Sequence, residues 1–264
     1  VFWIGGREMG RPLREKYTRQ PTPFCAGCGH GIFMNAFLRA VDEVGLDFRN
    51  TVFVSGIGCG AWVPSPHFRA DTLHVTHGRA VAFATGVKMT RPELDVIVIG
   101  GDGDIATIGG NHLIHAARRN VPLKVFCLNN LLYGMTGGQV SATTPQGDIT
   151  ATTRQGNPER AFDLVALARG AGAPYTARFP VSRPRNLEKG IINALRFDQF
   201  AFMEVLSLCP TQYGSANRAR RGFEGPSLIW SMLEWQKGIV VDREKFDPEE
   251  SEGRIPTGEW YAQS

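Results

Sequence analysis

Apolar residues recur along this chain in two patterns that alternate from one segment to the next. Short apolar runs rich in β-branched residues are typical of buried strands, and longer segments with apolar residues at helical spacing are typical of helices. Their alternation predicts an α/β domain with a mainly parallel sheet flanked by helices. We expect strands at residues 51–55, 94–100, 123–128 and 200–206, and helices at 31–44, 78–89, 107–120, 158–169 (capped by Asn157) and 183–197 (capped by Ser182).

The two ends of the chain lack this periodicity. Residues 1–23 are rich in Arg, Gly and Pro and are expected to form an extended arm. Residues 212–264 gain charge and aromatic side chains, so we expect a C-terminal tail that lies at a subunit interface. The central domain is therefore expected over residues 24–211. Within it, residues 131–155 form a long loop rich in Gly and Thr, and loops of that length are often functional.

Composition narrows the class of protein without identifying it. With 264 residues, of which 42% are hydrophobic, the chain can bury one sizeable core. It has no run of about 20 apolar residues, so no membrane-spanning segment is expected. The net charge is only +4 and no basic run is interleaved with aromatics, which argues against nucleic acid as a partner. Because no secretory leader is visible, we expect a cytoplasmic protein.

A Gly-Asp-Gly and an Asn-Asn each follow one of the predicted strands. Asp102 follows the strand 94–100, and Asn130 follows the strand 123–128. The carboxyl ends of parallel strands face the same crevice, so both side chains are expected at one rim. Carboxylate and amide oxygens are ligands that Mg²⁺ prefers, and glycine lets the backbone approach phosphate closely. The pattern indicates a metal and diphosphate site, although each motif alone is also a common turn.

Four of the five cysteines lie among turn-forming residues. Cys25 and Cys28 form a C-x-x-C, Cys59 stands between two glycines, and Cys209 precedes a proline. Cys127 lies inside an apolar strand and is expected to be a buried core residue. Four such thiolates suit structural zinc or a [4Fe-4S] cluster, and the C-x-x-C alone would also suit a thioredoxin-like redox pair. Disulfides are less favoured because the cysteine count is odd and no secretory leader is visible.

The Gly-Asp-Gly and the Asn-Asn, at this separation, resemble the signature of thiamine diphosphate enzymes. In that signature the two motifs bind the cofactor's diphosphate through a metal ion. The resemblance implies that Asp102, the side chain of Asn130 and the backbone carbonyl of Leu132 bind Mg²⁺.

Further motifs resemble the β, thiamine-binding subunit of 2-oxoacid:ferredoxin oxidoreductases, in particular those of the 2-oxoglutarate type. The matching stretches are residues 24–31, 55–59, 74–80, 100–104, 129–139 and 209–211, in that order. The resemblance implies that Cys25, Cys28, Cys59 and Cys209 hold a single [4Fe-4S] cluster near the thiamine cofactor. It implies catalytic roles for His77 and Arg79, and cofactor contacts from Gly58, Gly60, His77, Gly101, Asp102, Gly103, Asp104, Asn130, Tyr133, Gly134, Met135 and Thr136.

The activity that this resemblance implies is a reversible, coenzyme A-dependent oxidative decarboxylation of a 2-oxo acid. A cluster would pass the electrons to ferredoxin, an oxidative route that zinc cannot supply. We expect 2-oxoglutarate as substrate rather than pyruvate, and an α subunit as partner in an αβ or α2β2 assembly. The alternatives are a pyruvate:ferredoxin oxidoreductase subunit, a non-redox thiamine diphosphate decarboxylase or synthase, and a zinc-stabilised structural subunit.

A cluster of basic residues in the C-terminal segment has two interpretations. Arg218, Arg220 and Arg221 could meet the phosphates of coenzyme A, or they could form a solvated face, which is the favoured reading.

Overall fold

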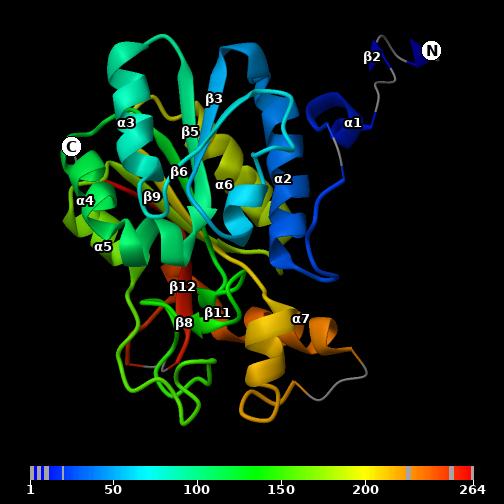
Figure 1. The fold of residues 1–264 in the computed structure, drawn as a ribbon, viewed down its shortest axis with the longest axis vertical. Coiled ribbons are helices and arrows are strands. Elements are labelled where there is room, and N and C mark those ends of the chain that lie inside the picture. The colour runs from blue at the N-terminus through cyan, green and yellow to red at the C-terminus, as the bar shows by residue number, and fades with distance from the viewer. Residues whose placement is uncertain are drawn as a thin grey trace.

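The computed structural model describes residues 12–19, 21–223, 227–249 and 253–262, together with two short strands, β1 (Trp3–Ile4) and β2 (Arg7–Glu8). Its centre is an eight-stranded sheet of order β11-β12-β9-β10-β6-β5-β3-β4 (Figure 1). Neighbouring strands run parallel except β12 and β9, which are antiparallel. The strands are β3 (Thr51–Ser55), β4 (Asp71–His74), β5 (Asp95–Gly101), β6 (Lys124–Asn129), β9 (Tyr175–Pro180), β10 (Ala201–Leu206), β11 (Val240–Asp242) and β12 (Ile255–Tyr261). The mainly parallel α/β fold is confirmed.

Helices cover both faces of the sheet (Figure 1). One face packs against α2 (Gly29–Val44) and α6 (Pro184–Arg196). The other face packs against α3 (Ala80–Thr90), α4 (Gly110–Arg118) and α5 (Leu164–Gly170). Outside these layers lie the short α1 (Leu13–Tyr17), the C-terminal α7 (Leu228–Ile239), and a separate pair of strands, β7 (Leu132–Tyr133) and β8 (Gln139–Val140).

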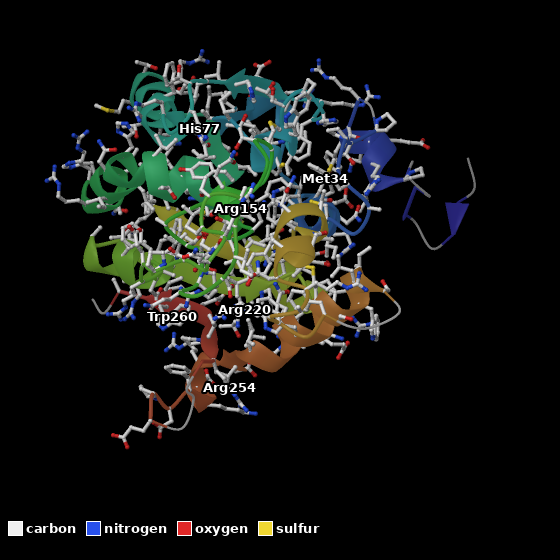
Figure 2. All side chains as sticks on the ribbon, turned by 60° about the horizontal axis from the view of Figure 1, so that its bottom comes forward. Met34, His77, Arg154, Arg220, Arg254 and Trp260 are labelled. Atoms are coloured by element: carbon white, nitrogen blue, oxygen red, sulfur yellow. The ribbon has the colours of Figure 1, made fainter. Side chains whose placement is uncertain are left out.

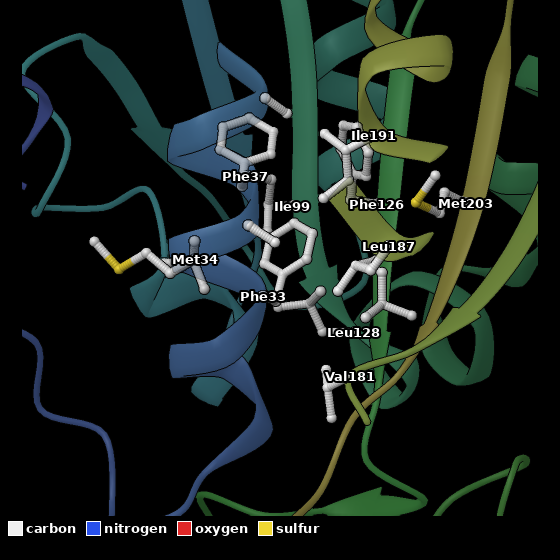
Figure 3. Packing of buried hydrophobic residues seen from close by; sticks show 14 of the residues in the cluster. Phe33, Met34, Phe37, Ile99, Phe126, Leu128, Val181, Leu187, Ile191 and Met203 are labelled. Atoms are coloured by element: carbon white, nitrogen blue, oxygen red, sulfur yellow. The ribbon is translucent and has the colours of Figure 1, made fainter. Parts of the chain in front are cut away.

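The two cores come from side chains that alternate along the central strands. Ile99 of β5 belongs to the cluster under α2 and α6, whereas Val98, one residue earlier, belongs to the cluster under α3 and α4. On the first side, Phe37 of α2 lies edge-on to Phe126 of β6, with ring centroids 5.5 Å apart, and Ile191 of α6 lies in the same cluster (Figure 3). Burying one such side chain fully stabilises the fold by about 1.5–3 kcal/mol compared with leaving the same side chain exposed to water.

The expected central strands, and the starts of the first two helices, are confirmed to within two residues. Strand β3 has the expected bounds, while β5, β6 and β10 begin one residue later than expected. Helix α2 starts at Gly29, and α3 at Ala80. The helix expected over 107–120 is shorter: a π-helical turn at Gly103–Ile108 leads into α4, which ends at Arg118. The strands β4 and β9 were not predicted.

The expected N-cap at Asn157 is wrong. Helix α5 begins at Leu164, and Asp163 caps it by accepting a hydrogen bond from the Ala166 N–H at 3.0 Å. The Asn157 amide instead donates to the Thr144 carbonyl at 2.8 Å, so it ties the long loop together.

The expected cap at Ser182 is also wrong. Helix α6 begins two residues later, at Pro184, where proline fits the first helical turn. The Ser182 backbone N–H donates to the Gln236 side chain at 3.0 Å, which connects this turn to α7.

The described part of residues 212–264 contains regular structure that the weak periodicity of this segment did not predict. Helix α7 and strands β11 and β12 lie there, and β12 joins the main sheet beside β9. In the N-terminal arm, α1 packs on α2, and the Tyr17 hydroxyl donates to Asp42 at 2.9 Å. Arm residues 1–2, 5–6, 9–11 and 20, and tail residues 224–226, 250–252 and 263–264, lie outside the described residues. Whether arm and tail form a subunit interface stays a prediction.

Within the described ranges, no helix is both long enough and apolar enough to cross a bilayer.

Candidate functional site

The two motifs meet where β5 and β6 end, as their register predicts. Gly101 of β5 is the partner of Leu128 of β6, so the residues that follow the two strands lie side by side. The backbone N–H of Asn130 donates to Oδ1 of Asp102 at 3.3 Å. Both side chains are buried, at 1% exposure for Asp102 and 6% for Asn130. The structure therefore brings the predicted pair into one buried site.

Asp102 is held by hydroxyl groups of the long loop. Its Oδ2 accepts hydrogen bonds from Ser141 Oγ and Thr143 Oγ1, each at 2.6 Å. Burial raises the pKa of the Asp102 carboxyl, although these hydroxyl groups and the Asn130 N–H oppose the rise. The loop contacts were not predicted from the motifs, and the richness of this loop in threonine was the one signal of them in the sequence.

Three oxygen atoms converge beside Asp102. The side-chain oxygen of Asn130 lies 2.7 Å from the Leu132 carbonyl oxygen and 3.0 Å from Asp102 Oδ1. When Asp102 is ionised, none of these atoms carries a hydrogen that could bridge them, and only a turned-over Asn130 amide would form hydrogen bonds there. A cation is the other way to satisfy three oxygens that face one point.

Asp104 accepts hydrogen bonds from two loops, one containing Ile57 and the other containing His77 and Gly78. Its Oδ1 accepts hydrogen bonds from the Gly78 N–H at 2.7 Å and the Ile57 N–H at 3.3 Å, and lies 2.8 Å from His77 Nδ1. This carboxylate therefore fixes the ring of His77, whose side chain remains 30% exposed. A Cβ on Gly56 would overlap the Asp104 carboxylate, so glycine is needed for this close approach.

A small cavity of about 40 Å³ lies at the centre of these residues. Room of that size suits about one water molecule, so the described chain encloses little free space there. All twelve of the predicted cofactor contacts line it: Gly58, Gly60, His77, Gly101, Asp102, Gly103, Asp104, Asn130, Tyr133, Gly134, Met135 and Thr136. Two predicted metal or cluster ligands line it as well: Leu132, through its backbone carbonyl in the prediction, and Cys59.

Arg79 is the predicted catalytic residue that this cavity leaves out. It is exposed, precedes α3 and donates to the Gly78 carbonyl at 3.3 Å. His30 does line the cavity: it is buried, its Nδ1 lies 2.9 Å from Ser207 Oγ, and its Nε2 has no protein partner. Burial lowers the pKa of His30 to about 4, so the ring is neutral at pH 7.

The four loop cysteines line a second cavity, of about 390 Å³. Burial raises the pKa of Cys28 to about 12 and that of Cys59 to about 11, and neighbouring thiols add to both rises. Cys25 and Cys209 complete the lining, whereas Cys127 is buried in β6 away from it. As they stand, no three His, Cys, Asp or Glu side chains of the described residues are close enough together to hold a metal ion.

The two cavities share a wall. Cys59, Asn130, Gly134 and Met135 line both of them. A Cβ on Gly134 would lie 3.2 Å from the Asn130 amide nitrogen and 3.5 Å from Cys59 Sγ. The cysteine cavity and the oxygen site are therefore separated by little more than one glycine.

The C-terminal arginines have a structural role that the sequence did not reveal. Asp148, fully buried in the long loop, pairs with Arg220 Nε at 3.1 Å and Arg221 Nη2 at 2.7 Å. The Tyr213 hydroxyl donates to the same carboxylate. Arg220 and Arg221 therefore brace the loop through Asp148 while their side chains stay 45% and 27% exposed. Figure 2 shows Arg220 well apart from His77.

Comparison with known proteins gives consistent results. The family model "Thiamine pyrophosphate enzyme, C-terminal TPP binding domain" matches residues 56–205. The 2-oxoglutarate synthase subunit KorB of Methanothermobacter marburgensis is 46% identical over 251 residues, which cover 93% of this chain and 85% of that protein. The 2-oxoglutarate oxidoreductase subunit KorB of Mycobacterium tuberculosis is 40% identical over 191 residues, 72% of this chain and 51% of that protein.

A solved structure is also similar: 2-oxoglutarate:ferredoxin oxidoreductase from Magnetococcus marinus with 2-oxoglutarate, coenzyme A and succinyl-CoA bound. Its TM-score to this chain is 0.83 at 31% sequence identity, and the match covers 98% of this chain and 87% of that one.

Proposed function

Because this chain belongs to the KorB family of 2-oxoglutarate synthase subunits, which are thiamine pyrophosphate enzymes, we propose that it supplies the cofactor-binding half of such an enzyme. In the reaction, 2-oxoglutarate and coenzyme A give succinyl-CoA, CO₂, one proton and two electrons. The electrons would leave singly through a [4Fe-4S] cluster to ferredoxin. The observation that carries the proposal is a converging set of three oxygens beside a cavity lined by four cysteines.

The oxygen site fits Mg²⁺. This ion binds oxygens at about 2.0–2.1 Å in octahedral geometry, so neighbouring ligand oxygens lie about 2.8–3.0 Å apart. The separations of 2.7 Å and 3.0 Å around the Asn130 oxygen agree with that spacing. Asp102, Asn130 and the Leu132 carbonyl would hold the ion, and the remaining positions would fall to diphosphate oxygens and water.

The cysteine cavity fits a cluster in its chemistry and size. Its volume of about 390 Å³ lies within the range of about 300–1,000 Å³ that is typical of ligand sites. The raised pKa values of Cys28 and Cys59 keep these thiols protonated at pH 7 in the absence of a cation. A bound cluster would remove these protons and supply a one-electron acceptor, which zinc would not.

Residues of this chain fix the positions of two side-chain rings at the site, those of His77 and Tyr133. Asp104 fixes the His77 ring at Nδ1, which leaves Nε2 as the atom that can hold or release a proton toward substrate. Gly103 admits the Tyr133 ring, because a Cβ there would overlap it. Arg79 does not line the cavity, so it would contact the 2-oxo acid only if that substrate extends beyond the cavity. Thiamine diphosphate, when bound, would supply the carbanion chemistry that removes CO₂.

Exposed apolar side chains at the site support an α subunit as partner. Ile57, Ile108 and Met135 are 36%, 42% and 46% exposed; Ile57 and Met135 line the small cavity, and Ile108 lies against Gly78. Apolar surface at the mouth of a site is typical of a protein interface. We propose that an α subunit covers this surface in a cytoplasmic αβ or α2β2 assembly.

The test is turnover by the complete enzyme, with this chain and its α subunit purified together. Carrier reduction that depends on coenzyme A, with kcat/KM higher for 2-oxoglutarate than for pyruvate, would support the proposal. A site that pairs the distal carboxylate leaves a buried cation unpaired when pyruvate binds, which weakens turnover. Equal or better turnover of pyruvate would favour the pyruvate enzyme, and a colourless protein without visible absorption would exclude the cluster.

A further inference from the structure

Leu131 stands between two of the three proposed Mg²⁺ ligands, Asn130 and Leu132, in an unfavourable conformation. Its φ is +70°, in the left-handed region that non-glycine residues rarely adopt. This sharp turn lets the Asn130 side chain and the Leu132 carbonyl face one point. Both polar groups of Leu131 are tied down: its N–H donates to Asn129 Oδ1 at 3.0 Å, and its carbonyl accepts from Thr144 Oγ1 at 2.6 Å.

A buried chain of hydrogen bonds runs from Asn129 across the sheet. The Asn129 amide nitrogen donates to Glu204 Oε1 on β10 at 2.7 Å, and Glu204 Oε2 accepts from Arg178 Nε on β9 at 2.6 Å. The three residues are 2–4% exposed. At its far end, Arg178 also pairs with Asp163, which caps α5.

The direction of each bond in this chain is set by the carboxylate. An ionised carboxylate only accepts hydrogen bonds, whereas a carboxamide presents a donor on one side and an acceptor on the other. Facing Glu204, Asn129 must present its NH₂ group, and its oxygen therefore faces the Leu131 N–H. Without that orientation two donors would meet at Leu131 and the left-handed turn would lose one of its two anchors.

We propose that Glu204 is a positioning residue for the metal site, although it touches none of the proposed ligands. By orienting the Asn129 amide it holds Leu131 left-handed, and so holds Asn130 and Leu132 in place for Mg²⁺. The inference rests on the proposed function, since it concerns the same cation site.

Glu204→Gln tests this by changing one acceptor into a donor at nearly constant shape. The glutamine oxygen stays with Arg178, so its NH₂ faces Asn129, whose amide turns over and points its own NH₂ at the Leu131 N–H. We expect Mg²⁺ affinity to fall by about 10–100-fold, as for other residues that support metal ligands indirectly. The measurement is calorimetric titration of Mg²⁺ into the metal-free complete enzyme at saturating thiamine diphosphate.

A polarity swap provides the rescue. In the double variant Glu204→Gln/Asn129→Asp, the glutamine NH₂ donates to the new carboxylate, which again accepts from the Leu131 N–H, so affinity should return close to that of the wild type. Asn129→Asp alone sets two carboxylates face to face and should lower affinity, which excludes a gain from added negative charge. Asp163→Asn removes the other acidic partner of Arg178 and leaves Asn129, Glu204 and Arg178 themselves unchanged. This variant should bind Mg²⁺ as the wild type does.

The outcomes separate the inference from the proposed function. Wild-type enzyme that fails to bind Mg²⁺ with thiamine diphosphate overturns the proposed function itself. Normal binding by the wild type and equal binding by Glu204→Gln overturns the inference alone, as does a double variant no better than Glu204→Gln. If Glu204→Gln does not fold, Thr144→Val removes the other anchor of Leu131 and should weaken Mg²⁺ binding, while Thr144→Ser retains it; equal binding by both overturns the inference.

Discussion

Replacing Asp102 with asparagine should separate cofactor binding from fold stability. The change removes one charge from the proposed Mg²⁺ site and keeps the size of the side chain. Ser141 and Thr143, which donate to Asp102, carry hydroxyl groups that can turn to accept from an amide instead. We therefore expect a folded protein with a weakened cation site.

The loss can be sized from the charge pair alone. A carboxylate about 2.1 Å from a divalent cation gains about 4 kcal/mol even at the dielectric constant of water. At about 1.4 kcal/mol per factor of ten, Mg²⁺ affinity should fall about a thousandfold.

Stability should change in the opposite direction. Burial raises the pKa of Asp102 above its ordinary value of 3.8, so the ionised carboxylate is less favourable in the folded apoprotein than in the unfolded chain. This residue's contribution to stability is therefore lost as pH rises from 3.8 through the folded pKa, and the ionised carboxylate destabilises the apoprotein at pH 7. An asparagine cannot ionise, so the cofactor-free variant should melt at the same temperature as the wild type or higher.

Two measurements test the reasoning. Calorimetric titration with Mg²⁺ and thiamine diphosphate gives the affinity, and thermal unfolding of the cofactor-free protein gives the stability. Iron content serves as the control, because the cysteine cavity should be unaffected. Unchanged Mg²⁺ affinity would show that Asp102 is not a metal ligand. A clearly lower melting temperature for the cofactor-free Asp102→Asn variant would show that the ionised carboxylate does not destabilise the fold.

Other predictions concern the cysteines and the partner. Replacing Cys25, Cys28, Cys59 or Cys209 with serine should lower bound iron, whereas Cys127→Ser, in the core of β6, should not; full iron occupancy in a Cys59 and Cys209 double variant would contradict the four-ligand assignment. The pKa of Cys59 is about 11, against an ordinary 9.0, so in the cluster-free chain at pH 8 this thiol should react with iodoacetamide about a hundredfold more slowly than an exposed cysteine. Mass spectrometry of the alkylated peptides measures both rates. The difference between the two rates should shrink as pH rises toward 11. The chain reconstituted alone should be catalytically silent in coenzyme A-dependent carrier reduction and become active when the α subunit is added; robust turnover in isolation would overturn the two-subunit proposal.

The sequence alone determined the central fold and the meeting of its two main motifs. Strands β5 and β6 follow each other through one helix, and a parallel pair joined in this way brings its carboxyl ends together. Asp102 and Asn130 could therefore be placed at one rim from local patterns only. The same holds for Cys127, because an apolar strand position decides its burial without reference to the rest of the fold.

Only the tertiary structure decided which distant segments complete the site. Ser141 and Thr143 reach Asp102 from a loop without periodicity, and Glu204 reaches Asn129 because β10 inserts between β6 and β9. The order of strands in a sheet depends on packing between segments far apart in the chain. Local periodicity reports which face of an element is buried, and it carries no information about which element lies next to it.

The C-terminal segment shows the same limit. Strand β12 pairs antiparallel with β9, and α7 supplies Gln236 to the turn before α6, yet neither element stands out from a charged, aromatic-rich sequence. Edge strands and peripheral helices bury only part of their surface, so few of their positions must be apolar and the periodic signal is weak. Their structure comes from the sheet that they join, and the sequence of the segment alone does not specify it.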